Sequence, residues 1–272
     1  EKNVVEEPED FVLKPADRWI LSKVNSLTKE MTENMDKFEL GIAVQKVHDF
    51  IWDEFCDWYV EIAKYRIYHA EEDSQSANCA LWVLKTVLGQ ALKLLHPFMP
   101  FITEEIYGAL VPEEESLMMS SWPVYREDWE FPYATEVMEH VKAITRGIRN
   151  MRAEMNVPNN KRTKVYIISS DSKLLTALEV LKESVKPLML ANDIILHYEK
   201  KDVADDAVSI VVPGATVYLP LEDLVDFEQE RERLKKEEER LNSEIKRAQG
   251  MLANERFTSK APADKVQAER DK

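Results

Sequence analysis

The spacing of the apolar residues constrains the fold of this chain more than any other feature. Between 135 and 155 these residues recur at intervals of 4, 3, 4, 3 and 4, which is typical of a helix whose apolar face meets a partner helix. Comparable spacing recurs through the preceding residues. The sequence therefore predicts a helical bundle, with helices near residues 15–31, 39–70, 78–95, 101–110 and 135–155.

Individual residues predict three details of this bundle. The third helix is apolar almost all round, so we expect it to be the central, buried one. Trp52, Phe55 and Tyr59 lie at helical spacing, which favours core positions over a surface for stacking bases. Asp17 falls in the first turn of the first helix, where the helix dipole favours a carboxylate.

The pattern changes after Pro158. Short apolar runs predict strands over 164–169, 194–198, 208–212 and 216–219, with a helix over 172–190 and a turn at Pro213-Gly214. From Leu221 onward, a charged helix with a heptad-like seam predicts an antiparallel coiled coil. We expect its returning helix to open at Pro262 and to be cut short by the end of the sequence.

The expected fold is therefore mainly α, in four parts. A linker (1–14) leads into a helical bundle (15–157), which is followed by a small α+β subdomain (158–220). A coiled-coil arm with a truncated return helix (221–272) completes the sequence.

Several classes of site are excluded by composition. The six glycines never lie within ten residues of one another, so neither a dinucleotide fingerprint nor a P-loop exists. Cys56 and Cys79 lie in helical patterns, and the five histidines are scattered, so we expect no metal, cofactor or catalytic residue here. Asp57 and Glu61 lie one turn apart without a third group that would favour catalysis. With no membrane-span or secretory pattern, we expect a cytoplasmic protein.

The charge is unevenly distributed. The whole chain carries -15, yet residues 142–164 carry seven basic residues and one acid, a local net of +6. Arg146, Arg149 and Arg152 advance three residues at a time and are expected to form one stripe beside the apolar seam. The stripe fits two interpretations, which are a patch that follows RNA phosphates and a solvated border of the core. Lys246 and Arg247 form a second basic pair in the arm.

Four strings in the sequence resemble a known family. They are DRWILS at 17–22, WxxFCDWYxE at 52–61, LHPFMPFITEE at 95–105 and IRNMRAEM at 148–155. Together with Pro158, they are similar to the C-terminal region of bacterial valine–tRNA ligases, which are class I aminoacyl-tRNA synthetases. The resemblance covers essentially the whole chain.

The resemblance implies a class I anticodon-binding bundle, a small connector and an arm that packs against the outer corner of tRNA-Val. It also implies that aminoacylation with ATP and editing belong to domains outside this sequence, because HIGH-type and KMSKS-type sequences are absent. One family helix would precede the linker. We expect the intact enzyme to be a monomer whose other domains are part of the same polypeptide.

Five residues are candidates for contact with tRNA. The resemblance points to Arg247 and Lys272 in the arm, Lys246 adjoins Arg247, and the basic stripe adds Arg149 and Arg152. The alternative function is a helical scaffold whose coiled coil binds a protein partner, with the basic stripe incidental. An independent hydrolase is disfavoured, because no nucleophile or metal constellation is present.

Overall fold

The structure is a computed structural model that describes residues 12–112, 116–220, 224, 227–253 and 267. The chain divides into two compact units, Glu1–Pro220 and Leu221–Lys272. The predicted boundary at 157/158 falls inside the first unit, so the division into bundle and α+β subdomain stays a prediction.

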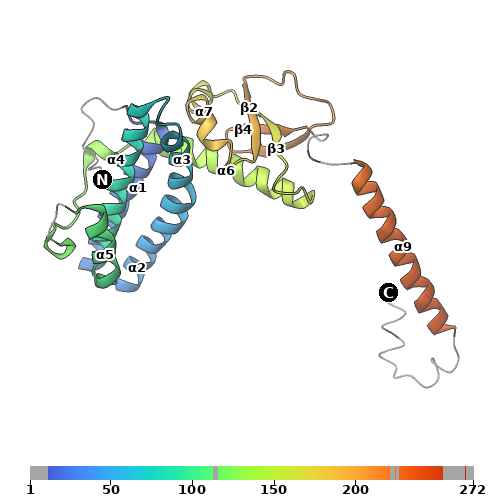
Figure 1. The fold of residues 1–272 in the computed structure, drawn as a ribbon, viewed down its shortest axis with the longest axis horizontal. Coiled ribbons are helices and arrows are strands. Elements are labelled where there is room, and N and C mark those ends of the chain that lie inside the picture. Colours follow the sequence, from blue (N-terminus) through green and yellow to red (C-terminus); the bar gives the residue numbers. More distant parts are fainter. Residues whose placement is uncertain (1–11, 113–115, 221–223, 225–226, 254–266, 268–272) are drawn as a thin grey trace. The chain divides into compact units, whose positions relative to one another are not determined.

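The first unit begins with a helical bundle (Figure 1), and the predicted helices are confirmed in order. The two that start at Pro100 and Pro132 begin earlier than expected, because proline favours the first turn of a helix. The helices are α1 (Pro15–Asp36), α2 (Leu40–Asp49), the π-helix η1 (Phe50–Val60), α3 (Glu61–Tyr68), α4 (Ser74–Leu95), α5 (Pro100–Leu110) and α6 (Pro132–Glu154), with short 3-10 turns η2 (Leu117–Met119) and η3 (Glu127–Trp129).

The bundle is centred on α1, which packs against α2, η1, α4 and α6. Its Trp19, Ile20 and Met31 are fully buried. The expectation that the third helix, α4, would be the central one is only partly confirmed. No residue from 79 to 96 is exposed, but large side chains such as Trp82 and Leu84 remain half-buried.

The long helix predicted over 39–70 is continuous but contains an unexpected π-helical segment, η1. In a π-helix the hydrogen bonds run from residue i to i+5, so each turn holds more residues than the 3.6 of an α-helix. Phe55 and Tyr59 are buried as predicted. Trp52 is 55% exposed, which overturns its predicted core position, because the wider turn rotates it away from Phe55.

Asp17 interacts with the helix dipole of α1 and also lies at the centre of a buried cluster of hydrogen bonds. Its carboxylate is fully buried, and it accepts two hydrogen bonds of 2.7 Å from Nη1 of Arg66 on α3. It also accepts hydrogen bonds from the Tyr59 hydroxyl at 2.7 Å and from the Lys14 backbone N–H at 2.9 Å. Burial and the neighbouring Asp17 charge raise the pKa of Tyr59 well above its usual range. The cluster therefore ties the start of α1 to η1 and α3.

A four-stranded sheet follows the bundle in the same unit, in the order β2-β1-β4-β3. β1 and β2 are parallel and are connected through α7, whereas β4 runs antiparallel to both β1 and β3. The predicted strands are confirmed, and the helix ends earlier than expected, before Pro187. The elements are β1 (Thr163–Ile168), α7 (Ser172–Val185), β2 (Ala191–His197), β3 (Val208–Val212) and β4 (Ala215–Leu219).

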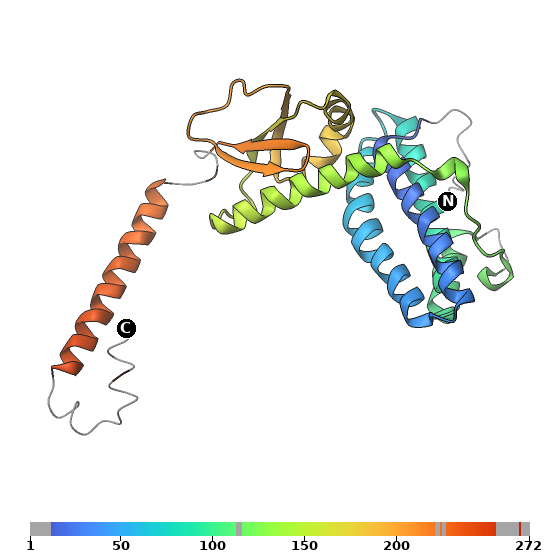
Figure 2. The same ribbon diagram turned by 180° about the vertical axis from the view of Figure 1, so that it is seen from behind.

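Helix α6 joins the two halves of this unit, because it packs against α1 in the bundle and against α7, β3 and β4 beyond it (Figure 2). Gly147 permits the close approach, since a Cβ there would lie 3.2 Å from Val212 Cγ1 and 3.3 Å from Ile210 Cγ2. At the hairpin turn Gly214 has a φ of +77, and a Cβ there would lie 2.8 Å from the His140 ring. Helix α6 therefore packs against helices and against the sheet.

The second unit contains α9 (Phe227–Leu252), the first helix of the expected arm. Arg240 forms ion pairs with Glu237 and Glu244 along its surface, while Leu241 and Ile245 are 46% and 45% exposed. The predicted return helix lies outside the described residues, so the antiparallel coiled coil stays a prediction. No helix in the described part of the chain is long and apolar enough to cross a membrane.

Candidate nucleic-acid interface

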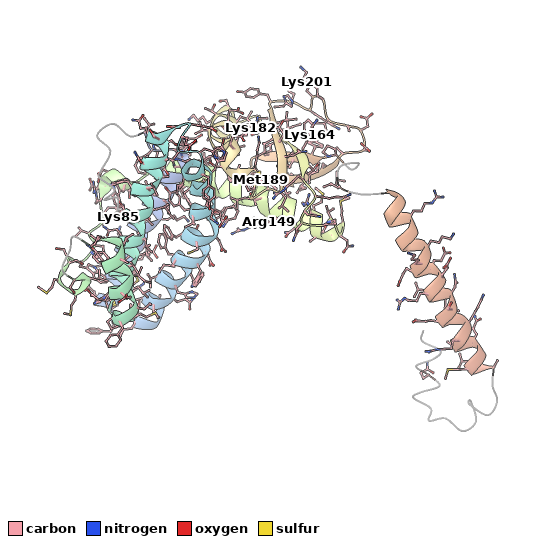
Figure 3. All side chains as sticks on the ribbon, viewed as in Figure 1. Lys85, Arg149, Lys164, Lys182, Met189 and Lys201 are labelled. Atoms are coloured by element: carbon pink, nitrogen blue, oxygen red, sulfur yellow. The ribbon has the colours of Figure 1, made fainter. Side chains whose placement is uncertain are left out.

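Two arginines of the predicted stripe, Arg146 and Arg149, are exposed on the second half of α6. Figure 3 shows Arg149 near Met189, which lies just after α7. The Nε of Arg149 donates a hydrogen bond of 3.1 Å to the Leu188 carbonyl. Neither arginine forms an ion pair with a carboxylate among the residues that the structure describes. Because one hydrogen bond fixes Nε, the two Nη groups of Arg149 remain available for an anion.

The third arginine, Arg152, corrects the prediction of a single exposed stripe. It is 2% exposed, and its Nη2 donates hydrogen bonds to the carbonyls of Pro158 and Lys161 at 3.0 and 2.7 Å. Arg152 follows the buried Ile148 by four residues and therefore shares its inward face. Burial and the nearby charge of Arg162 lower the pKa of its guanidinium. Arg152 holds the loop after α6 in place, and a direct phosphate contact would require that loop to move.

Lys142 is also buried, although the local charge count treats it as a surface cation. Its Nζ forms ion pairs with Glu54 at 2.5 Å and with Glu139 at 3.1 Å, and lies 4.9 Å from the centre of the Trp19 ring. Although partial burial opposes the shift, hydrogen bonds and charge from Lys142 and Lys23 lower the pKa of Glu139. The positive charge that reaches the surface from 142–164 is therefore smaller than the sequence implies.

The loop that Arg152 holds supplies a further exposed cation. Nη1 of Arg162 donates a hydrogen bond of 3.2 Å to the Pro187 carbonyl. Arg149 and Arg162 thus hold consecutive carbonyls, those of Leu188 and Pro187, from two different elements. The segment after α7 therefore fixes both arginines on one face of the first unit.

A hollow of about 610 Å³ lies between η1 and α6. Arg146 and Arg149 line it from α6, and Asp53, Asp57 and other residues line it from the long helix. Partial burial, with a contribution from the Asp57 charge, raises the pKa of the Cys56 thiol at this wall. The hollow thus has acidic and basic side chains on opposite walls. Its lining is Asp53, Cys56, Asp57, Trp58, Glu61, Arg146, Arg149, Pro187 and Leu188.

The structure also exposes aromatic residues that the sequence analysis missed. Phe38, between α1 and α2, is 86% exposed and has a φ of +59, an uncommon conformation for a bulky residue. Phe101, at the start of α5, is 90% exposed. The ends of α2 and α5 that carry them lie at the same end of the bundle in both views (Figures 1 and 2). The helix breaks before Leu40 and at Pro100 are the sequence signals that could have indicated them.

In the second unit Lys246 and Arg247 are exposed near the end of α9, as a role in RNA contact requires. Lys272 lies outside the described residues. Contact of any of the five candidate residues with RNA stays a prediction. Within the described ranges, no group of three or more histidine, cysteine, aspartate or glutamate side chains is placed to hold a metal ion.

Two family models match the chain. Residues 17–167 match the anticodon-binding domain of tRNA ligases, and residues 226–272 match the tRNA-binding arm of valyl-tRNA synthetases. The first match spans more than half of the chain and covers all but the first two residues of the bundle helices. The second match begins one residue before α9.

Curated relatives carry the name valine–tRNA ligase. The chain is 47% identical over 257 residues to the enzyme of Clostridium perfringens and 44% identical over 257 residues to that of Clostridium acetobutylicum. It is 38% identical over 260 residues to that of Oceanobacillus iheyensis. Each alignment covers 94% of this chain and 29% of the relative, so the chain spans less than a third of the length of these proteins.

Proposed function

Because the chain belongs to the family of anticodon-binding domains of tRNA ligases, we propose that it is the tRNA-recognition region of a valine–tRNA ligase. It binds tRNA-Val and presents the acceptor end to a catalytic domain that uses ATP and lies outside this sequence. We assign it no catalytic residue, metal or cofactor of its own. The intact enzyme is a cytoplasmic monomer in this proposal.

The observation that carries the proposal is the exposed aromatic end of the bundle. Phe38 and Phe101 present almost their entire side chains to solvent, within residues that match an anticodon-binding domain. Unpaired RNA bases are recognised by stacking on aromatic side chains and by hydrogen bonds to their edges. Each stacked base contributes about 1–3 kcal/mol. Anticodon bases stack here in the proposed complex.

Phosphate contacts supply the remaining affinity. Arg149 offers both Nη groups from the first unit, and Lys246 and Arg247 offer charge from α9. Lys272 is a further candidate, because the family resemblance points to it. Arg152 acts as a positioning residue, because its hydrogen bonds hold the loop from which Arg162 reaches the Pro187 carbonyl.

The mechanism rests on orientation. Holding a reactant in the correct geometry converts a bimolecular encounter into an effectively unimolecular step, which lowers the barrier without a chemical group from the binding region. In this proposal the bundle binds the anticodon and the coiled-coil arm packs against the outer corner of the tRNA. A variant of either contact therefore raises KM for tRNA and leaves valine–ATP exchange unchanged.

A binding experiment with this chain tests the proposal. We expect tRNA-Val to bind more tightly than a non-cognate tRNA, with affinity falling steeply between 50 and 200 mM salt, on the order of tenfold for each two to three phosphate contacts. Phe38→Ala and Phe101→Ala should each weaken binding of tRNA-Val about tenfold. Tyr198→Ala, which removes an exposed aromatic of the sheet region, is the matched control.

Equal, salt-insensitive binding of both tRNAs, or none at all, would contradict the proposal. That outcome would fit the alternative, a coiled-coil scaffold for a protein partner, which the family matches do not favour.

A further inference from the structure

The hollow between η1 and α6 has charges of opposite sign on its two walls. Arg146 and Arg149 line it from α6, while Asp53 and Asp57 line it from η1. All four side chains are exposed, and no ion pair joins them across the hollow among the residues that the structure describes. Because these oppositely charged groups face the same hollow without pairing with each other, they are available to a ligand. Such a ligand would carry an anionic group for the arginines and hydrogen-bond donors for the aspartates.

The chemistry of the two walls defines that ligand. A guanidinium only donates hydrogen bonds and matches the oxygens of a phosphate, whereas an ionised carboxylate only accepts them. The ligand must therefore combine an anionic phosphate with hydroxyl or amino donors a few ångströms away. A ribonucleotide has this combination, because its 2′-hydroxyl and the exocyclic amines of its base are donors.

The surrounding structure supports a formed site. Arg149 is fixed by its hydrogen bond to Leu188, and the volume of about 610 Å³ falls within the usual range for ligand pockets. The acidic wall belongs to the π-helical segment, and π-helical turns occur frequently at functional sites. The π-helix also keeps Asp53 and Asp57, four residues apart, on one face toward the hollow.

We propose that this hollow binds a single ribonucleotide, with the phosphate on Arg146 and Arg149 and the sugar or base donors on Asp53 and Asp57. The inference deepens the proposed function, since it names a ligand unit for the cations on α6. The nucleotide is either free or one unpaired residue of an RNA strand, and the same chemistry recognises both.

Titration of the whole chain with small probes tests the site. We expect 5′-AMP to bind about tenfold more tightly than inorganic phosphate and measurably more tightly than 5′-dAMP, as measured by competition in ligand-observed NMR. Asp57→Asn should weaken AMP binding about tenfold without weakening that of inorganic phosphate. Arg146→Gln should weaken both. Asp205→Asn and Arg231→Gln, which change exposed charges outside the hollow, are the matched controls.

A second measurement distinguishes the two sources of the nucleotide. If Asp57→Asn also weakens binding of tRNA-Val, the nucleotide is part of the RNA, and if only AMP binding falls, it is free. The proposal is overturned if AMP binds no better than phosphate, or if Asp57→Asn binds AMP as well as or better than the unchanged chain does. The latter result would mean that the acids merely repel phosphate. If this chain still binds tRNA-Val when either of these results is found, the proposed function is supported although the nucleotide site is not.

Discussion

Two sets of aspartates and arginines adjoin the same long helix, and they differ in burial and in pairing. Asp17 and Arg66 are buried and joined by two hydrogen bonds, whereas Asp57 and Arg146 are exposed and unpaired with each other across a hollow. A buried charge must be compensated within the protein, while an exposed one can exchange water for a ligand. The comparison shows that residue type alone does not separate a structural ion pair from a binding group.

The largest effect is expected at the buried pair. Arg66→Met leaves the Asp17 carboxylate buried without its cation, and we expect a loss of about 3–5 kcal/mol in the free energy of unfolding. Urea denaturation followed by circular dichroism measures it. Arg146→Met is the matched control and should stay within about 0.5 kcal/mol, as exposed substitutions usually do. A similar loss in the free energy of unfolding for both variants would contradict the distinction between the buried pair and the exposed arginines of the hollow.

Arg152 sharpens the comparison, because it is buried like Arg66 but interacts with carbonyls alone among the described residues. Arg152→Met leaves no carboxylate uncompensated. We expect a smaller loss of about 1–2 kcal/mol from two carbonyls that lose their donor. A loss as large as that of Arg66→Met, under the same denaturation protocol, would point to a buried counter-charge.

An exposed cation should affect RNA binding and leave stability unchanged. In an intact enzyme that carries this chain, Arg247→Glu is expected to raise KM for tRNA-Val about tenfold, through loss of a charge-assisted contact to phosphate. Valine–ATP exchange should be unaffected, because it requires no tRNA. Impaired exchange would contradict the assignment of Arg247 to tRNA contact.

The smallest effect is expected at Glu139, which is half exposed like the groups at the hollow but paired with a lysine like the buried groups. Lys142 and Lys23 lower its pKa in the folded state, so its pairing contributes stability above the unfolded-state pKa, and this contribution is lost as the pH falls through the folded-state pKa. Lys142→Met should raise the pKa of Glu139, as measured by NMR titration of the side-chain carboxyl. An unchanged pKa would show that Lys142 does not govern this carboxylate.

Charge at the surface was the least predictable property. The excess of positive charge in 142–164 suggested a continuous basic stripe, yet Lys142 is paired inside the protein and Arg152 faces inward. The position of Arg152 four residues after Ile148 was a usable signal, because residues at that spacing share a helix face. Nothing local indicates the pairing of Lys142 with Glu54, since the two are far apart in the chain.

For the aromatic residues the difference has the opposite direction, because the structure exposes side chains that the sequence does not predict to be at the surface. The sequence predicts a core position for Trp52, which is exposed, and it gives no strong signal for Phe38 and Phe101, which are exposed at the end of the bundle. A straight α-helical projection cannot anticipate a π-helical segment, whose wider turns shift the buried face. Two of these residues, Phe38 and Phe101, lie at the aromatic end of the bundle, where a function is proposed.

The sequence alone determined the order of the helices and strands, the hairpin at Pro213-Gly214 and the family resemblance, because apolar spacing and turn residues act over a few neighbouring positions. The tertiary structure decided which charges are buried in pairs and which line the hollow. That choice depends on partners such as Asp17 and Arg66, whose separation along the chain leaves no periodic signal. Their pairing exists only once the helices have packed.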